Sequence, residues 1–178
     1  MGSVILVCGL NGAGKSTLAK ALAERLNLCF IDIEDIYFSR QDNPDYPYEK
    51  SRPYEEVVSM LTNIANGEND FVLASVTGSF GDEFISNLKC VISIEVPKEI
   101  RLKRVHNRSY ILFGEKSCKG GDYYEQIKSF HNFCASRDDN LVNDWLSTLC
   151  CPIFRVDGTL PIRDNVNLIA KKLNSQKE

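Results

Sequence analysis

The stretch GLNGAGKST, from Gly9 to Thr17, concentrates three glycines within six positions and then places a lysine and two hydroxyl residues directly after them. It follows the apolar run 4–8, which is continuous and rich in β-branched residues and therefore predicts a strand buried on both faces. It precedes KSTLAKALAERLN (15–27), where leucines recur every four residues and predict a helix. A glycine-rich turn thus joins a buried strand to a helix.

The spacing within this turn is Gly9-x4-Gly14-Lys15-Ser16, which matches the phosphate-binding pattern GxxxxGK[ST] without a mismatch. Glycine lets the backbone amides wrap a polyphosphate, and the helix N-terminus adds unpaired N–H groups. Lysine supplies a charge to the β and γ oxygens, and the serine hydroxyl is suited to Mg²⁺. We expect the following residues to bind ATP: Gly9, Asn11, Gly12, Ala13, Gly14, Lys15, Ser16 and Thr17. The other interpretation is a tight strand–helix turn without a ligand.

Strand-like and helical stretches alternate along the rest of the chain, which predicts a parallel sheet with right-handed crossovers. The expected strands are 4–8, 29–33, 71–76, 90–96 and 152–156. The expected helices are 15–27, 53–66, 81–87, one opening at Pro97, a long one over 122–149, and 161–173. We expect one α/β domain over 1–178: a three-layer P-loop NTPase fold with a five-stranded parallel sheet, order 2-3-1-4-5. A helical lid is expected over approximately 108–122.

The composition excludes several classes of protein. The chain has 178 residues, is 43% hydrophobic and carries a net charge of −3, so a surface dedicated to nucleic acid or anionic membrane is not expected. No stretch approaches the roughly 20 apolar residues of a membrane span, and no leader pattern opens the chain, so we expect a cytoplasmic protein. We expect it to be a monomer or a homodimer. The seven cysteines show no CxxC pair. We expect Cys8, Cys29 and Cys90 to be buried, and Cys118, in an expected loop, to be the cysteine that is exposed.

Missing motifs and the acidic segment FIDIEDIYF (30–38) together indicate which class of P-loop protein this is. GTPase motifs are absent, and the strand FVLASVT (71–77) lacks the carboxylate typical of oligomeric ATPases. The segment resembles the acidic stretch after the second strand of gluconate kinase, shikimate kinase and nucleotide kinases. The resemblance implies that Asp32 is the catalytic carboxylate and a Mg²⁺ ligand beside Ser16, with Glu34 and Asp35 near the acceptor. A solvated acidic loop that caps a helix is the alternative.

The basic helix EIRLKRVHNR (99–108) resembles the lid-entry helix of shikimate and nucleotide kinases. Arg101, Arg104 and Arg108 fall on one helix face, and arginine forks bind phosphate oxygens. We expect Arg104 and Arg108 to act in transfer, whereas pairing with nearby acids is the alternative. The sequence allows two roles for Arg137. It either reaches the site or pairs with Asp138 or Asp139.

Two further segments complete the resemblance. FRVDGTLPIRDNV (154–166) is similar to the loop after strand five that lies beside adenine in small P-loop kinases, which implies base contacts at Gly158 and Thr159. The segment 39–54 lies where related kinases bind their acceptors, and there Arg52 is a candidate. Gly78 is a further candidate, because nucleotide kinases have an Asp-Gly pair after the third strand and this chain keeps only the glycine of that pair. A sugar, a nucleoside and an acidic metabolite suit this segment equally well.

The function expected from the sequence is an ATP- and Mg²⁺-dependent kinase acting on a small hydroxyl- or phosphate-bearing acceptor. Two other classes are open. One is a nucleotide-binding switch or slow ATPase without a small-molecule acceptor, and the other is a nucleotide-binding module without chemistry.

Replacing Lys15 with alanine tests this expectation. The substitution is expected to abolish phosphoryl transfer because it removes the charge that faces the β and γ oxygens. The fold is expected to survive, so ADP formation should vanish while the circular dichroism spectrum stays the same. Unchanged activity would remove the kinase hypothesis.

Overall fold

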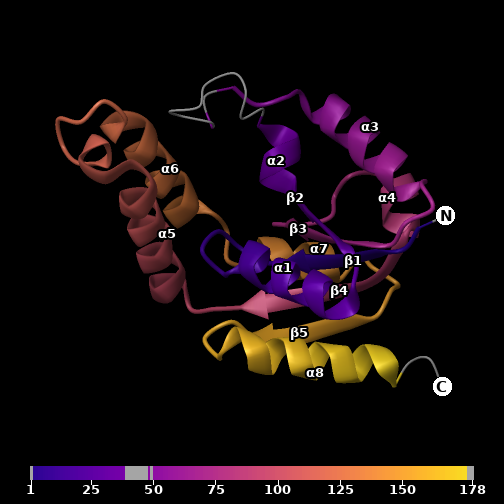
Figure 1. Ribbon diagram of the computed structural model, residues 1–178. Coiled ribbons are helices and arrows are strands. Elements are labelled where there is room, and N and C mark those ends of the chain that lie inside the picture. The colour runs from indigo at the N-terminus through magenta and orange to yellow at the C-terminus, as the bar shows by residue number, and fades with distance from the viewer. Residues whose placement is uncertain (1, 39–47, 49, 176–178) are drawn as a thin grey trace.

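The computed structural model describes residues 2–38, 48 and 50–175. Its centre is a sheet of five parallel strands in the order β2-β3-β1-β4-β5, which confirms the expected topology (Figure 1). The strands are β1 Val4–Cys8, β2 Cys29–Asp32, β3 Phe71–Ser75, β4 Leu88–Glu95 and β5 Ile153–Asp157. The helices are α1 Lys15–Leu26, α2 Ile33–Tyr37, α3 Tyr54–Ala65, α4 Asp82–Ser86, α5 Lys98–Phe113, α6 Tyr124–Ser136, α7 Leu141–Leu146 and α8 Ile162–Asn174, with a 3-10 turn η1 Gly114–Ser117.

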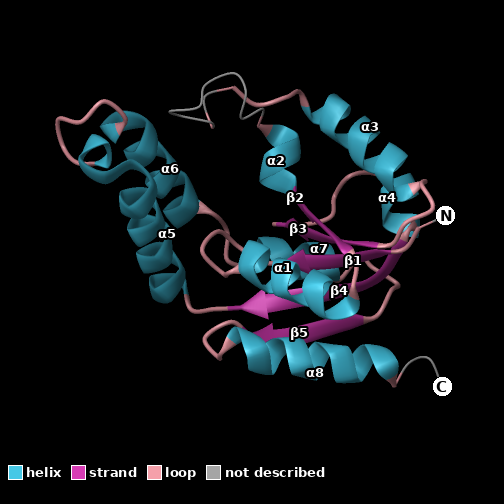
Figure 2. Cartoon of the chain, viewed as in Figure 1, coloured by secondary structure: helices cyan, strands magenta, loops and turns pink. Residues whose placement is uncertain are grey.

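Helices cover both faces of the sheet, so the fold has the three expected layers (Figure 2). Side chains alternate along β1, as the two-residue period of a strand requires. Leu6 faces a core shared with α2, α3, α4 and α7, and Val7 faces a second core shared with α1 and α8. All five residues of β1 are buried, which explains why its sequence is apolar without interruption.

The parallel arrangement brings the carboxyl ends of the strands to one edge of the sheet. The glycine-rich loop follows β1 there, and Asp32 ends β2 two strands away. Ligands of open α/β sheets bind at this edge, where the chain connections on either side diverge. The fold therefore gathers the sequence motifs in one region.

The second strand is one residue shorter than expected, because Ile33 begins α2 rather than ending β2. The Asp32 carboxylate accepts a hydrogen bond of 3.0 Å from the backbone N–H of Glu34 and so caps the new helix. The alternating apolar and acidic residues of this segment resemble a strand in sequence, and the cap is what turns the chain.

The region after β4 also differs from the expectation. α5 continues as far as Phe113, and the expected long helix over 122–149 is two helices, α6 and α7, separated by residues 137–140. Arg137 is extended there, with φ −60° and ψ 135°. α5 and α6 form a pair that stands away from the sheet, and the expected lid residues 108–122 lie at its outer end (Figure 1).

The cysteines follow the sheet order rather than local hydrophobicity. Cys8 and Cys90 are buried as expected, but Cys29 is exposed because β2 is an edge strand. Cys118 is only half-exposed, whereas Cys150 is exposed, so the expectation that Cys118 is the exposed cysteine was wrong. All seven are free thiols.

Within the described part of the chain, no helix combines the length and apolar character that crossing a bilayer requires.

The core between α1 and the sheet offers a direct test of the packing. Leu22 is fully buried there, so Leu22→Ala is expected to lower the free energy of unfolding by about 2–5 kcal/mol through lost burial and a residual cavity. Lys20→Ala on the exposed side of the same helix should stay within about 0.5 kcal/mol of the parent. Urea titration of both variants measures the difference; equal midpoints would contradict the assigned core.

Candidate functional site

The phosphate loop between β1 and α1 is held in conformations that favour glycine. Gly12 has φ +82°, and a Cβ on it would lie 2.2 Å from the carbonyl oxygen of Arg101. Gly14 has φ +97° and is the N-cap of α1. The first turn of α1 contains no acidic residue, so its N–H groups point toward the loop without a competing carboxylate from that turn. The loop has the form of an anion cradle.

Lys15 reaches back over this loop, where its ammonium nitrogen lies 3.4 Å from the carbonyl oxygen of Leu10. Desolvation by the surrounding protein lowers the pKa of Lys15 from 10.5 to about 8, although the nearby carboxylates of Glu34 and Asp32 act in the opposite direction. Arg108 and Arg137 lower it further. A polyphosphate at the loop would relieve this repulsion, so the side chain is arranged to receive an anion.

The two hydroxyl residues after Lys15 lie at the start of α1, Ser16 half-buried and Thr17 exposed. The acidic residues approach from the end of β2 and from α2. Asp32 caps α2 through one carboxylate oxygen. Glu34 lies with its carboxylate oxygen 3.8 Å from the guanidinium nitrogen of Arg108. Asp35 is exposed on α2.

The three arginines of α5 have different surroundings. Arg101 is only 4% exposed and is anchored to the Val96 carbonyl at 3.2 Å and to the Asp139 carboxylate at 2.7 Å, which is a structural role. Arg104 donates to the carbonyl of Gly158 at 3.0 Å and therefore lies on the β5–α8 side of the loop. Arg108 is nearly half-exposed and faces Glu34. Their roles in transfer stay predictions.

Arg137, which the sequence left open, reaches the site. Its guanidinium donates to the side-chain oxygen of Asn11 at 2.8 Å, and it lies 4.7 Å above the ring of Phe133. Asp139 pairs instead with Arg101 and Lys98. Arg108 and Arg137 are therefore both within electrostatic range of Lys15.

A cavity of about 430 Å³ opens beside the loop on the β5–α8 side. Gly158 and Thr159 line it, together with Ala13, Gly14 and Arg104. The Thr159 hydroxyl and then its N–H donate to Asp157, which lowers the pKa of that carboxyl and closes the turn. The segment that the resemblance assigned to adenine thus lies next to the phosphate loop.

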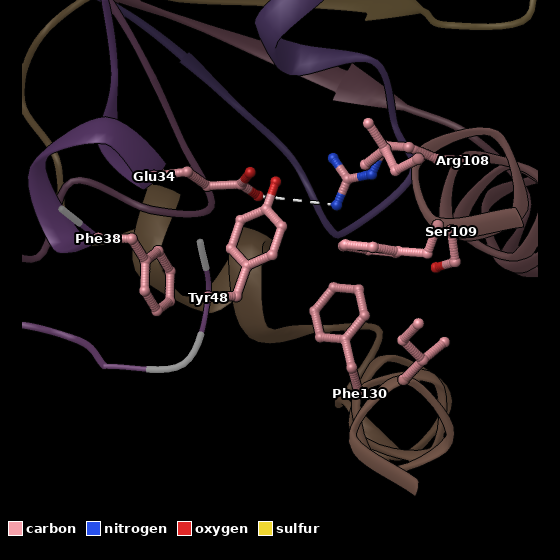
Figure 3. A pocket seen from close by; sticks show the side chains of 9 residues that line it. Glu34, Phe38, Tyr48, Arg108, Ser109 and Phe130 are labelled. Atoms are coloured by element: carbon pink, nitrogen blue, oxygen red, sulfur yellow. Dashed lines mark ion pairs between the residues drawn. The ribbon is translucent and has the colours of Figure 1, made fainter. Parts of the chain in front are cut away.

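A second cavity, of about 210 Å³, lies between α2, α5 and α6 (Figure 3). It is lined by Glu34, Phe38, Tyr48, Arg108, Ser109, Leu112, Phe113, Ile127 and Phe130. We call it the α5–α6 cavity. Ion-paired Glu34 and Arg108 lie at one end of it, and aromatic side chains enclose the rest.

Other residues expected to bind the acceptor lie apart from this cavity. Arg52 is hydrogen-bonded to the carbonyl of Ile36 and paired with Glu56 at 3.3 Å. Gly78 packs where a Cβ would meet Leu6 and Trp145, so it serves close packing. Asp32 and Asp35 are not among its lining residues, and residues 39–47 of the expected acceptor segment lie outside the described residues.

Sequence reasoning missed most of the cavity wall, above all Ser109, Ile127 and Phe130. These residues come from two helices, and no short motif links them. The available signal was the spacing of Ile127, Phe130 and Phe133, which recur every three residues in α6. This helical spacing is equally typical of an ordinary core.

The sheet order, the glycine loop and its lysine together define a P-loop, kinase-like protein. A family model described as an AAA domain matches residues 5–119, and the chain belongs to that family. The carboxylate-free end of β3 is a departure from the oligomeric ATPases considered above.

The similarity to other proteins covers almost the whole chain. The uncharacterized protein YqaC of Bacillus subtilis (strain 168) is 25% identical over 179 residues, covering 96% of this chain and 97% of that protein. A shikimate kinase from Bacteroides thetaiotaomicron superposes with a TM-score of 0.59 at 21% identity, covering 97% and 98% of the two chains. A gluconokinase from Sinorhizobium meliloti 1021 superposes with a TM-score of 0.56 at 16% identity, covering 99% of this chain and 98% of that chain. These solved structures establish the shared fold.

The lowered pKa of Lys15 predicts a pH-dependent affinity for nucleotide. Above about pH 8 the free protein holds Lys15 neutral, so binding a polyphosphate requires uptake of a proton. We expect the affinity for ADP to fall up to about tenfold per pH unit above pH 8 and to change little below pH 7. Calorimetry at pH 7, 8 and 9, in buffers of different protonation enthalpy, measures both affinity and proton uptake. Equal affinity across this range, or the same slope in Lys15→Ala, would contradict the assignment.

Proposed function

We propose that this chain is an ATP-dependent phosphotransferase that moves the γ-phosphoryl group of ATP to a small hydroxyl- or phosphate-bearing acceptor. One observation carries the proposal: one cavity adjoins the phosphate loop, and a second begins at side chains that act electrostatically on Lys15. The larger one shares Ala13 and Gly14 with the loop. The α5–α6 cavity begins at Glu34 and Arg108, which are both within electrostatic range of Lys15. A transferase needs two such sites that meet at the transferred group.

In this proposal the larger cavity takes the base of ATP. Gly158 and Thr159 contact the base, and Arg104 covers it, since the Arg104 guanidinium is held at the Gly158 carbonyl. The loop amides and the N-terminus of α1 bind the phosphates, with Lys15 at the β and γ oxygens. Arg108 and Arg137 are the additional cations near the transferred group, where they offset developing charge.

Mg²⁺ fits the residues available at the loop. Among the described residues, no group of three or more histidine, cysteine or acidic side chains could hold a metal ion by itself. Mg²⁺ keeps several waters and binds through one or two protein oxygens plus phosphates. Ser16 and Asp32 would supply those oxygens, and the ion would neutralise charge on the phosphates of ATP.

The transfer step is an in-line displacement. An acceptor oxygen forms a bond to the γ-phosphorus while the bond to the β,γ-bridging oxygen breaks, and ADP leaves with that electron pair. Asp32 accepts the proton of the acceptor hydroxyl or positions that hydroxyl. Since one oxygen of Asp32 already caps α2, the carboxylate is held in a fixed orientation. The names shikimate kinase and gluconokinase of similar structures support this reaction class, and their low identity leaves the acceptor open.

Arg108 provides the test. Arg108→Ala is expected to lower the turnover of acceptor-dependent ADP formation by a factor on the order of 10³, because it removes a cation from the transferred group. The affinity for ADP should change far less. Arg163→Ala, on the exposed face of α8, is the matched control and should behave as the parent. Coupled assay of ADP release and calorimetry with ADP give the two readouts.

The contrary result is equally specific. ATP hydrolysis at the same rate with and without every acceptor, together with a nucleotide-dependent change in oligomeric state, would favour a switch or slow ATPase and overturn the proposal.

A further inference from the structure

We infer that the acceptor is a hydroxyl compound built on a planar aromatic ring, of the nucleoside or aromatic-alcohol type, and not a polyhydroxy acid. This inference rests on the proposed function and names the substrate class of the same site. It comes from the walls of the α5–α6 cavity, which are mainly apolar and aromatic.

The cavity has a prearranged aromatic wall, and we call the space beside this wall the slot. The rings of Phe38 and Tyr48 meet edge to face, with centroids 5.3 Å apart and an interplanar angle of 84°. Figure 3 shows these two rings on the α2 side, with Phe130 across from them on α6. Leu112 and Ile127 add to the apolar lining. Aromatic rings are attracted to one another in stacked and edge-to-face contacts, so such a slot favours a flat ring.

The polar groups of the lining are concentrated at one end. Glu34, Arg108 and the hydroxyl of Tyr48 lie there (Figure 3), and Glu34 and Arg108 are also within electrostatic range of Lys15. Ser109 contributes little elsewhere, because its hydroxyl is already bonded to the Val105 carbonyl at 3.1 Å and to His131 at 2.9 Å. A bound acceptor therefore points its hydroxyl toward Lys15 and its ring into the slot.

A polyhydroxy acid fits these walls poorly. Its several hydroxyl groups would be buried against phenylalanine and isoleucine without partners, which is costly. Its carboxylate would face Glu34, and Arg108, the cation of the described lining, is already paired with that residue. The cost of burying its hydroxyl groups against apolar side chains therefore disfavours a polyhydroxy acid.

The size of the cavity points the same way. Pockets for drug-sized ligands span roughly 300–1,000 Å³. The α5–α6 cavity is smaller, at about 210 Å³, and so suits one ring system whose hydroxyl-bearing part extends toward the phosphate loop.

Calorimetry on the full chain separates this inference from the proposed function. ADP with Mg²⁺ is titrated first, and the ADP-loaded protein is then titrated with adenosine, cytidine, 4-hydroxybenzyl alcohol, gluconate and shikimate. We expect ADP to bind, at least one ring compound to bind saturably, and gluconate and shikimate to give no saturable heat. Absence of ADP binding overturns the proposed function. ADP binding with no ring compound bound, or with a preference for gluconate or shikimate, overturns the substrate class alone.

Variants of the slot supply the second test. Phe130→Ala is expected to weaken binding of the ring compound about tenfold or more, because it removes a stacking surface, while ADP binds as in the parent. Phe38→Ala should have the same effect from the opposite wall. Ile111→Ala is the matched control, since Ile111 is 81% exposed on α5 and lies outside the lining. Unchanged affinity in both phenylalanine variants overturns the inference, and an equal loss in Ile111→Ala does so as well.

Discussion

The contact between Gly12 and the backbone of Arg101 is the constraint on which the site depends. The two segments approach so closely that a Cβ on Gly12 would lie 2.2 Å from the Arg101 carbonyl oxygen. The Arg101 side chain strengthens this contact, since it is buried and donates to the carbonyls of Val96 and Asn11. The phosphate loop and the start of α5 therefore have one relative position. Every later residue of α5 takes its place from that contact.

This anchoring also fixes the positions of the next two arginines of α5. Arg104 lies about one turn further along the helix, and there its guanidinium meets the Gly158 carbonyl on the side of the larger cavity. Arg108 follows one turn later and meets Glu34 on the side of the smaller cavity. A single helix thus contributes one cation to the lining of each cavity. The spacing of three and four residues is what makes both placements possible.

The sheet and the helical pair α5–α6 carry different parts of the chemistry. The strands and the glycine loop form the anion cradle, which is common to kinase-like proteins with different acceptors in their names. The wall of the smaller cavity comes instead from α2, α5 and α6, whose side chains there are largely aromatic and aliphatic. In the proposed function, selectivity for the acceptor depends on that wall and phosphate binding depends on the loop.

The sequence by itself determined the sheet order, the phosphate loop and the gathering of Asp32, Glu34 and the α5 arginines near it. The phosphate loop and the individual elements follow from short-range patterns, namely a buried strand, glycines at fixed spacing and helical periodicity. The positions of the acidic residues and the arginines follow from the resemblance to small kinases. Tertiary structure alone decided that Arg137 reaches Asn11, that Arg101 is structural, and that Phe38 and Phe130 face one slot. Each of these depends on segments distant in the chain that pack together, and local periodicity carries no information on which helix faces will meet. Cys29 is exposed because β2 is an edge strand, which the expected strand order already implied and which the local hydrophobicity around Cys29 did not reveal.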